Sequence, residues 1–159
     1  MTISDTRSEA DDKSGATLCR LTTEAGHQVH EQCIVRDDIY QVRAVVSRWI
    51  ADPEVHAVIT TGGTGLTGRD GTPEAVAPLL DKVIDGFGEM FRVLSYDLIG
   101  TSTIQSRTLA GVANGTFVFC LPGSSGACKD GWNKLISHQL DYRTRPCNLV
   151  ELMPRLLET

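Results

Sequence analysis

The stretch that decides the fold is TTGGTGLTGRDGTPEA, residues 60–75, which joins an apolar segment to the start of a helix. The segment VHAVITT at 55–61 is short, apolar and ended by glycines, so it predicts a buried strand. Pro73 suits the first turn of a helix, and Thr72 is predicted to cap that helix. A strand, a glycine-rich turn and a helix form the unit from which parallel α/β sheets are built.

Further elements continue this alternation on either side. Helices are predicted over 16–25, which Gly26 is placed to end, and over 39–51, where apolar residues recur at helical spacing. Strands are predicted at 27–35 and 116–121. Residues 86–114 are predicted to be mostly helical with a break near Gly100, and a further helix is predicted from the Pro122–Ser124 turn to about 139. Pro146 is expected to end the regular structure. The pattern predicts one α/β domain over 1–159, with helices covering both faces of a mostly parallel sheet.

The first residues are short for a buried strand. Residues 1–15 are mostly polar and are predicted to form a loop, and Met1-Thr2-Ile3 leads directly into Ser4-Asp5. Two alternatives stay open: the segment is a stub that suffices, or the strand is truncated and its remainder lies upstream.

Bulk composition narrows the function classes. The 159 residues suit a single core, and a net charge of −5 gives no broad basic face for nucleic acid or membranes. The polar start resembles no signal peptide and no apolar run is long enough to span a membrane, so we expect a cytoplasmic protein. Five cysteines without a C-x-x-C pair, and four histidines without a ligand pattern, disfavour a disulfide framework and a zinc site.

Ligands of parallel α/β sheets bind at the carboxyl ends of the strands, which directs attention to the loops after Val35, Thr61 and Leu121. In the second of these loops, free amides and a helix N-terminus favour an anion, and Arg69 adds a charge-assisted donor. Asp70 and Glu74 would repel a phosphate unless a cation such as Mg²⁺ lay between them. A flexible surface loop is the alternative. The dinucleotide fingerprint (Gly63, Gly65, Gly68) matches only weakly, because Pro73 sets a late helix start.

The other two loops leave similar choices open. LPGSSGACKDGW at 121–132 either binds a polar group or is a plain capped turn, and Cys128 within it is either a reactive thiol or a small buried residue. One of Asp37 and Asp38 is expected to cap the following helix, which frees the other to ligate a metal. The segment 4–7 either helps to bind phosphate or is only a polar terminus.

Taken together, these segments resemble the MoaB/MogA family of molybdopterin-binding proteins. The similarity runs in order along nearly the whole chain, and GFGE, IGTS and RPCNL favour the MoaB branch. The segments are SDTR (4–7), DDKSG (11–15), AGH (25–27), IVRDD (34–38), TTGGTGLTGRDGTPEA (60–75), GFGEMFR (86–92), SYDLIGTSTIQSR (95–107), AGVANGT (110–116), LPGSSGAC (121–128) and RPCNL (145–149).

The resemblance implies a three-layer αβα fold, a trimer or a hexamer of two trimers, and binding of molybdopterin. It also implies adenylylation of molybdopterin with Mg-ATP, with Asp37 and Asp70 as the catalytic, Mg²⁺-binding carboxylates. A non-catalytic molybdopterin carrier, or an assembly module that contacts other molybdenum-cofactor enzymes, is the alternative; the intact R-D-x-T-P-E-A sequence at 69–75 favours the catalyst. The residues implied in binding molybdopterin and nucleotide are Ser4, Asp5, Gly62, Gly63, Thr64, Gly65, Arg69, Glu74, Pro122, Gly123, Ser124, Ser125 and Gly126.

Overall fold

A six-stranded sheet forms the centre of the molecule in the computed structural model, which describes residues 1–158. Its strand order is β2-β1-β3-β6-β5-β4, and β2, β1, β3 and β6 run parallel. Only β5 runs antiparallel to its neighbours, so the predicted, mostly parallel sheet is confirmed. The strands are β1 (Thr2–Ile3), β2 (Ile34–Val35), β3 (Ala57–Thr61), β4 (Lys82–Val83), β5 (Leu109–Ala113) and β6 (Thr116–Leu121).

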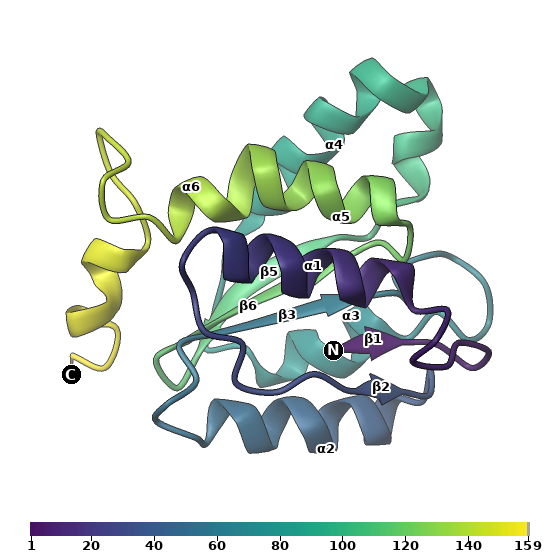
Figure 1. The fold of residues 1–159 in the computed structure, drawn as a ribbon, viewed down its shortest axis with the longest axis horizontal. Helices are drawn as coiled ribbons and strands as arrows, with labels where there is room; N and C mark the ends of the chain where they lie inside the picture. The colour runs from purple at the N-terminus through teal and green to yellow at the C-terminus, as the bar shows by residue number, and fades with distance from the viewer. Residues whose placement is uncertain (159) are drawn as a thin grey trace.

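Helices cover both faces of this sheet, which gives the three layers expected (Figure 1). One face carries α1 (Lys13–Glu24), α4 (Asp85–Ile99) and α5 (Ser125–Gly131), followed by a π turn (Trp132–Ile136) and α6 (Ser137–Gln139). The other face carries α2 (Ile39–Ile50) and α3 (Thr72–Val76), which a 3-10 turn (Ala77–Leu79) extends. No helix within residues 1–158 is long and apolar enough to cross a membrane.

The wholly buried strand β6 explains why the core has two halves. Successive side chains of a strand point to opposite faces, so Val118 packs with α2 and α3 while Phe117 and Phe119 pack with α1, α4 and α5. Val46 and Phe91 anchor the two halves from the helices, with 0% and 3% of their surfaces exposed. A continuous apolar run such as TFVFCL is therefore what a central strand requires.

The expected helical stretch at 86–114 is wrong in its second half. Helix α4 ends at Ile99, a 3-10 helix runs over Gly100–Gln105, and 109–113 form β5. Strand β5 turns directly into β6 through Asn114 (φ 47°) and Gly115 (φ 80°). Positive φ at both residues is the geometry of a tight hairpin, for which Asn-Gly is the strongest short signal. That dipeptide was the overlooked indication of an antiparallel pair.

Several element boundaries also differ from expectation. Helix α1 begins at Lys13 because the buried Asp12 caps it by accepting from the Gly15 amide at 2.9 Å. Of the strand expected at 27–35, only the last two residues pair in the sheet. Regular structure also continues beyond Pro146, as a 3-10 helix over Val150–Arg155.

Strand β1 is short but lies inside the sheet. Thr2 and Ile3 are both buried and pair with β2, and Thr2 also faces Thr61 of β3. The Met1 amino group donates to the Ile59 carbonyl at 2.8 Å, which extends the contact with β3 by one residue. A cavity of about 450 Å³ lies beside Met1 and Thr2, and residues 27–32 and β3 also line it.

Candidate functional site

Four loops meet where the parallel strands end. Residues 4–7 follow β1, residues 36–38 follow β2, residues 62–71 follow β3, and Pro122–Ser124 follow β6. A cavity of about 770 Å³ opens between these loops, and the start of α5, α4 and the 3-10 helix after α4 close its remaining sides. The three loops singled out from the sequence are therefore neighbours in space.

Most of the residues expected at a binding site line this cavity. Arg69, Glu74 and Ser125 do not: Arg69 lies 75% exposed with its guanidinium 2.6 Å from Asp5, and Glu74 pairs with Arg107. No motif in the sequence indicates the wall contributed by α4 and the following 3-10 helix, because these residues come together only through tertiary packing. The expected residues that line the cavity are Ser4, Asp5, Asp37, Gly62, Gly63, Thr64, Gly65, Asp70, Pro122, Gly123, Ser124 and Gly126; those missed include Phe91, Ser95, Ser102, Thr103, Gln105 and Ser106.

Glycine is required at the first two positions of the loop after β3. Gly62 has a φ of 108°, and a Cβ there would lie 2.2 Å from the carbonyl oxygen of Ile3. Gly63 has a φ of 62°, and a Cβ there would lie 2.3 Å from the Thr72 hydroxyl oxygen. That hydroxyl donates to the Gly62 carbonyl at 2.8 Å and so fixes the start of the loop. The backbone is thereby held against the cavity without side chains in between. The expectation that Thr72 caps α3 is wrong, because Thr72 is the first residue of the helix and Gly71 is its N-cap.

The two neighbouring carboxylates after β2 have separate roles. Asp38 caps α2, because its carboxylate accepts from the amides of Tyr40 and Gln41 at 3.0 and 2.9 Å. Asp37 instead lines the cavity, and within residues 1–158 its carboxylate accepts a single hydrogen bond, from the Gly71 amide at 3.3 Å. The sequence predicts that one of the two aspartates caps α2, and in the structure this residue is Asp38.

The electrostatic states of Asp37 and Asp70 differ. Burial raises the pKa of Asp37, and the negative charges of Asp70 and Asp5 raise it further against the opposing Gly71 amide. Hydrogen bonds from the Thr67 hydroxyl (2.5 Å) and amide (2.8 Å) lower the pKa of Asp70. The negative charge of Asp37 is thus less well stabilised by its surroundings than that of Asp70.

This carboxylate pair fits a magnesium ion shared with a phosphate ligand. Mg²⁺ is commonly held by one or two carboxylates plus substrate phosphates, and it would offset the repulsion between Asp37 and Asp70. Within residues 1–158, no three His, Cys, Asp or Glu side chains form a metal cage of their own. The donor set therefore suits an ion that arrives with a phosphorylated ligand.

We expect Asp37→Asn to melt at a higher temperature than the wild type at pH 7 without metal. The pKa of Asp37 is raised in the folded state, so its ionised form destabilises folding above that pKa and has no effect below the unfolded-state value. The gain should therefore disappear as the pH falls through the raised pKa. Thermal melts from pH 3 to 8 test this; a gain that is constant with pH would contradict it.

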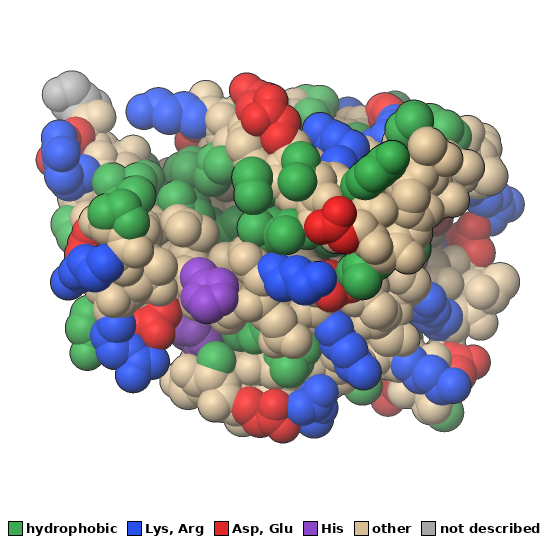
Figure 2. Space-filling model, turned by 90° about the horizontal axis from the view of Figure 1, so that it is seen from above, with side chains coloured by type: hydrophobic (Ala, Val, Ile, Leu, Met, Phe, Trp, Pro, Cys, Tyr) green, Lys and Arg blue, Asp and Glu red, His purple; other side chains and the backbone are tan. Residues whose placement is uncertain are grey.

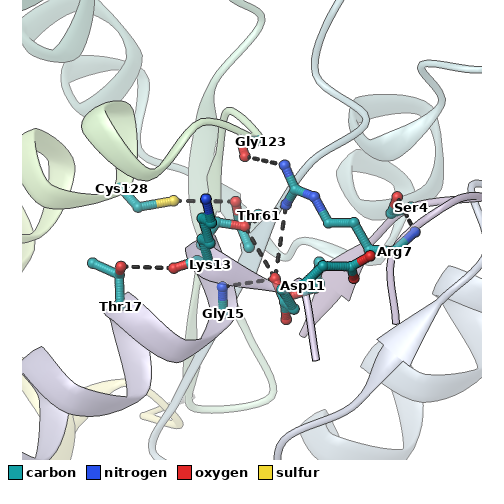
Figure 3. A network of polar contacts seen from close by, with 12 residues as sticks. Ser4, Arg7, Asp11, Lys13, Gly15, Thr17, Thr61, Gly123 and Cys128 are labelled. Atoms are coloured by element: carbon teal, nitrogen blue, oxygen red, sulfur yellow. Dashed lines mark hydrogen bonds and ion pairs between the residues drawn. The ribbon is translucent and has the colours of Figure 1, made fainter. Parts of the chain in front are cut away.

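Arg7 joins the loop after β1 to the loop after β6 (Figure 3). Its guanidinium donates to the Gly123 carbonyl at 2.7 Å and to the Ser14 hydroxyl at 2.5 Å, with the buried Asp12 carboxylate 3.7 Å away. Asp12 also accepts from the Thr2 hydroxyl at 2.6 Å. The polar terminus expected to be a loop is thus an ordered side of the site.

The turn after β6 is built as a helix cap. The Ser124 side chain accepts from the Ala127 amide at 3.2 Å, and Ser124, Gly126 and Ala127 at the start of α5 line the cavity. Cys128 is fully buried, with its sulfur 3.1 Å from the Thr61 hydroxyl, and burial raises the pKa of its thiol. Of the two alternatives for Cys128, the small buried residue is the one found.

Comparison with known proteins gives consistent matches. A family model described as a probable molybdopterin binding domain matches residues 1–142. Molybdenum cofactor biosynthesis protein B of Escherichia coli K12 is 53% identical over 148 residues, covering 93% of this chain and 87% of the relative. The protein of that name from Bacillus subtilis is 44% identical over 146 residues, covering 91% and 86%.

Solved structures agree with these matches. A crystal structure of molybdenum cofactor biosynthesis protein B superposes with a TM-score of 0.85 at 49% identity, covering 87% of each chain. The tungsten cofactor synthesizing protein MoaB from Pyrococcus furiosus gives 0.77 at 38% identity, covering 86% of this chain and 88% of that one.

Proposed function

Because this chain belongs to the molybdopterin-binding domain family of molybdenum cofactor biosynthesis, in its MoaB branch, we propose that it binds molybdopterin and adenylylates it with Mg-ATP. In this reaction a terminal phosphate oxygen of molybdopterin attacks the α-phosphorus of ATP. The new P–O bond forms as the bond to the β-phosphate breaks, and pyrophosphate leaves. The products are adenylylated molybdopterin and pyrophosphate.

Such a transfer needs little covalent help from the protein, so positioning and charge neutralisation do most of the catalysis. The amides of residues 62–65 and the start of α5 line the cavity and would orient the phosphates and the pyranopterin. Asp37 and Asp70 would hold Mg²⁺, which when bound neutralises charge on the phosphates. Arg69 pairs with Asp5 rather than lining the cavity, and we assign it to the rim.

The observation that carries this proposal is the position of Asp37 and Asp70. They come from different loops, yet both line the cavity beside the backbone of Gly63 and Gly65. A protein that only carries molybdopterin gains nothing from two like charges next to a phosphate ligand. The intact Arg69–Ala75 sequence favours the same conclusion.

The deciding experiment supplies purified protein with molybdopterin and Mg-ATP and measures pyrophosphate release together with the mass of the pterin product. An adenylyltransferase gains one AMP unit on the pterin for each pyrophosphate released. Pterin binding without pyrophosphate would support the carrier instead. The mass of any pterin that co-purifies with the protein is an independent test, because it should match molybdopterin or its adenylate.

We also propose that the chain assembles into a trimer, or a hexamer of two trimers, through the face that carries α4. In Figure 1, α4 rises past the sheet at the upper right, and the view from above shows hydrophobic side chains between charged ones (Figure 2). The large hydrophobic residues exposed on α4 and the following 3-10 helix are Met90, Val93, Tyr96, Leu98, Ile99 and Ile104. An apolar patch of this kind is more typical of an interface than of a free surface.

Light scattering at micromolar concentration should therefore give a trimeric or hexameric mass. We expect Val93→Glu to reduce that mass, because the charge would be buried between subunits. Tyr40→Glu, on the exposed start of α2, is the matched control and should leave the mass unchanged. A wild-type protein that is only monomeric would contradict the proposal.

A further inference from the structure

Arg107 lies outside the cavity, yet it bonds to both ends of the glycine-rich loop. Its backbone amide donates to the Thr64 carbonyl at 3.1 Å. Its guanidinium donates to the Gly65 carbonyl at 2.8 Å through Nε and to the Asp70 carbonyl at 2.6 Å through Nη2. The remaining nitrogen, Nη1, pairs with the Glu74 carboxylate at the start of α3. All four acceptors belong to one segment of the chain, so Arg107 fixes the path of that segment.

These bonds determine where the loop amides point. In a trans peptide, the carbonyl of one residue and the N–H of the next point in opposite directions. Because the Asp70 carbonyl faces Arg107, the Gly71 N–H faces away from it, and that N–H donates to Asp37 at 3.3 Å. Because the Thr64 carbonyl accepts from Arg107, the Gly65 N–H faces away from Arg107. Gly65 lies against the Asp70 carboxylate, since a Cβ on this glycine would lie 2.7 Å from Asp70 Oδ2, and its amide helps to lower the pKa of that carboxyl.

We propose that Arg107 is the positioning residue of this site, which sets the places of Asp37 and Asp70 by orienting the peptide groups 64–65 and 70–71. It touches neither carboxylate itself. The part of this inference that concerns Mg²⁺ rests on the proposed function, whereas the part that concerns the two peptide groups does not.

Arg107→Lys is the informative variant. A lysine keeps the charge and the backbone amide, but its single ammonium cannot reproduce the planar fork that reaches Gly65, Asp70 and Glu74 together. Arg43→Lys is the matched control. Arg43 also donates twice to this part of the chain, to the carbonyls of Glu74 (2.8 Å) and Ala75 (3.1 Å), but within residues 1–158 its side chain forms no hydrogen bond to the loop 62–71.

The first measurement is amide hydrogen exchange of the free protein, resolved by NMR. In Arg107→Lys, the amides of Gly65 and Gly71 should exchange about ten-fold faster, since they lose the orientation that holds them on the carboxylates. Core amides of β3 and β6 should be unchanged. In Arg43→Lys, the two glycine amides should exchange as in the wild type.

The second measurement is the Mg²⁺ dependence of adenylylation, with Mn²⁺-ATP binding followed by electron paramagnetic resonance. Arg107→Lys should raise the Mg²⁺ concentration for half-maximal rate about ten-fold or more, as loss of a group that orients metal ligands does. Molybdopterin affinity without Mg-ATP should fall less than the apparent affinity for Mg²⁺, because peptide 64–65 is only one of the groups that line the cavity.

The two measurements separate the two ideas. If the wild type does not adenylylate but Arg107→Lys still exposes the Gly65 and Gly71 amides, the proposed function fails and the positioning role of Arg107 stands. Unchanged exchange at both glycines in Arg107→Lys, or equal changes in Arg43→Lys, would overturn the inference.

Discussion

Asp70→Asn is expected to slow adenylylation by about 10²-fold or more, which corresponds to roughly 3 kcal/mol of lost barrier lowering. The substitution keeps the shape of the side chain and its capacity to accept from Thr67, but it removes the charge that would hold Mg²⁺. An amide is a weaker ligand than a carboxylate for this hard cation. Molybdopterin binding without Mg-ATP should survive, because backbone amides and neutral hydrogen bonds would hold the pterin.

Asp37→Asn should act in the same direction, and the double variant should lose less than the product of the two single losses if both residues hold one ion. Asp38→Asn is the matched control: this neighbour only caps α2, and Asn is an equally good cap. Single-turnover kinetics beside a pterin titration would measure all four variants. Near-normal turnover in Asp70→Asn would rule out its role as a metal ligand.

Gly62→Ala is expected to lower the free energy of unfolding by about 3 kcal/mol, from the positive φ and the clash with the Ile3 carbonyl together. For a chain of this size the melting temperature should fall by about 10 °C. The clash is with backbone, and Ile3 belongs to β1 inside the sheet, so neither side can move without breaking strand pairing.

Gly68→Ala is the control in the same loop, because a Cβ at that position meets no atom within 4 Å and the backbone there does not have a positive φ. Thermal and urea unfolding should show Gly68→Ala within about 0.5 kcal/mol of the wild type. Equal melting temperatures for the two alanine variants would show that the close approach of Gly62 to β1 is not maintained in solution.

The sequence predicted those parts of the site in which neighbouring residues determine the structure. An apolar run that ends in Gly62 and Gly63 predicts a strand and a loop at its carboxyl end, and the fold places three such loops together. The Asn114-Gly115 hairpin is equally local, but it lies within a stretch whose composition predicts a helix. The order of strands in the sheet follows from no single segment.

Arg7 and Arg107 could not be found in this way. Arg7 bonds to a carbonyl 116 residues further along the chain, and Arg107 to carbonyls 42 and 37 residues before it. Both bind backbone oxygens, which every residue carries, so no pattern of side chains marks their partners. The wall formed by α4 is also a product of tertiary packing rather than of a motif.

The pairing of β3 with β6 has a consequence for how this chain folds. In the centre of the sheet, residues 57–61 pair with residues 117–121. This contact is highly non-local, because about 60 residues of chain separate the two strands. Chains with such contacts fold slowly, and β3 stays exposed during synthesis until β6 has left the ribosome. The step that pairs the two strands also brings the loop 62–71 beside Pro122–Ser124. A ligand that spans both loops should therefore protect the whole molecule against global unfolding, and an intermediate without β6 should have no affinity for it.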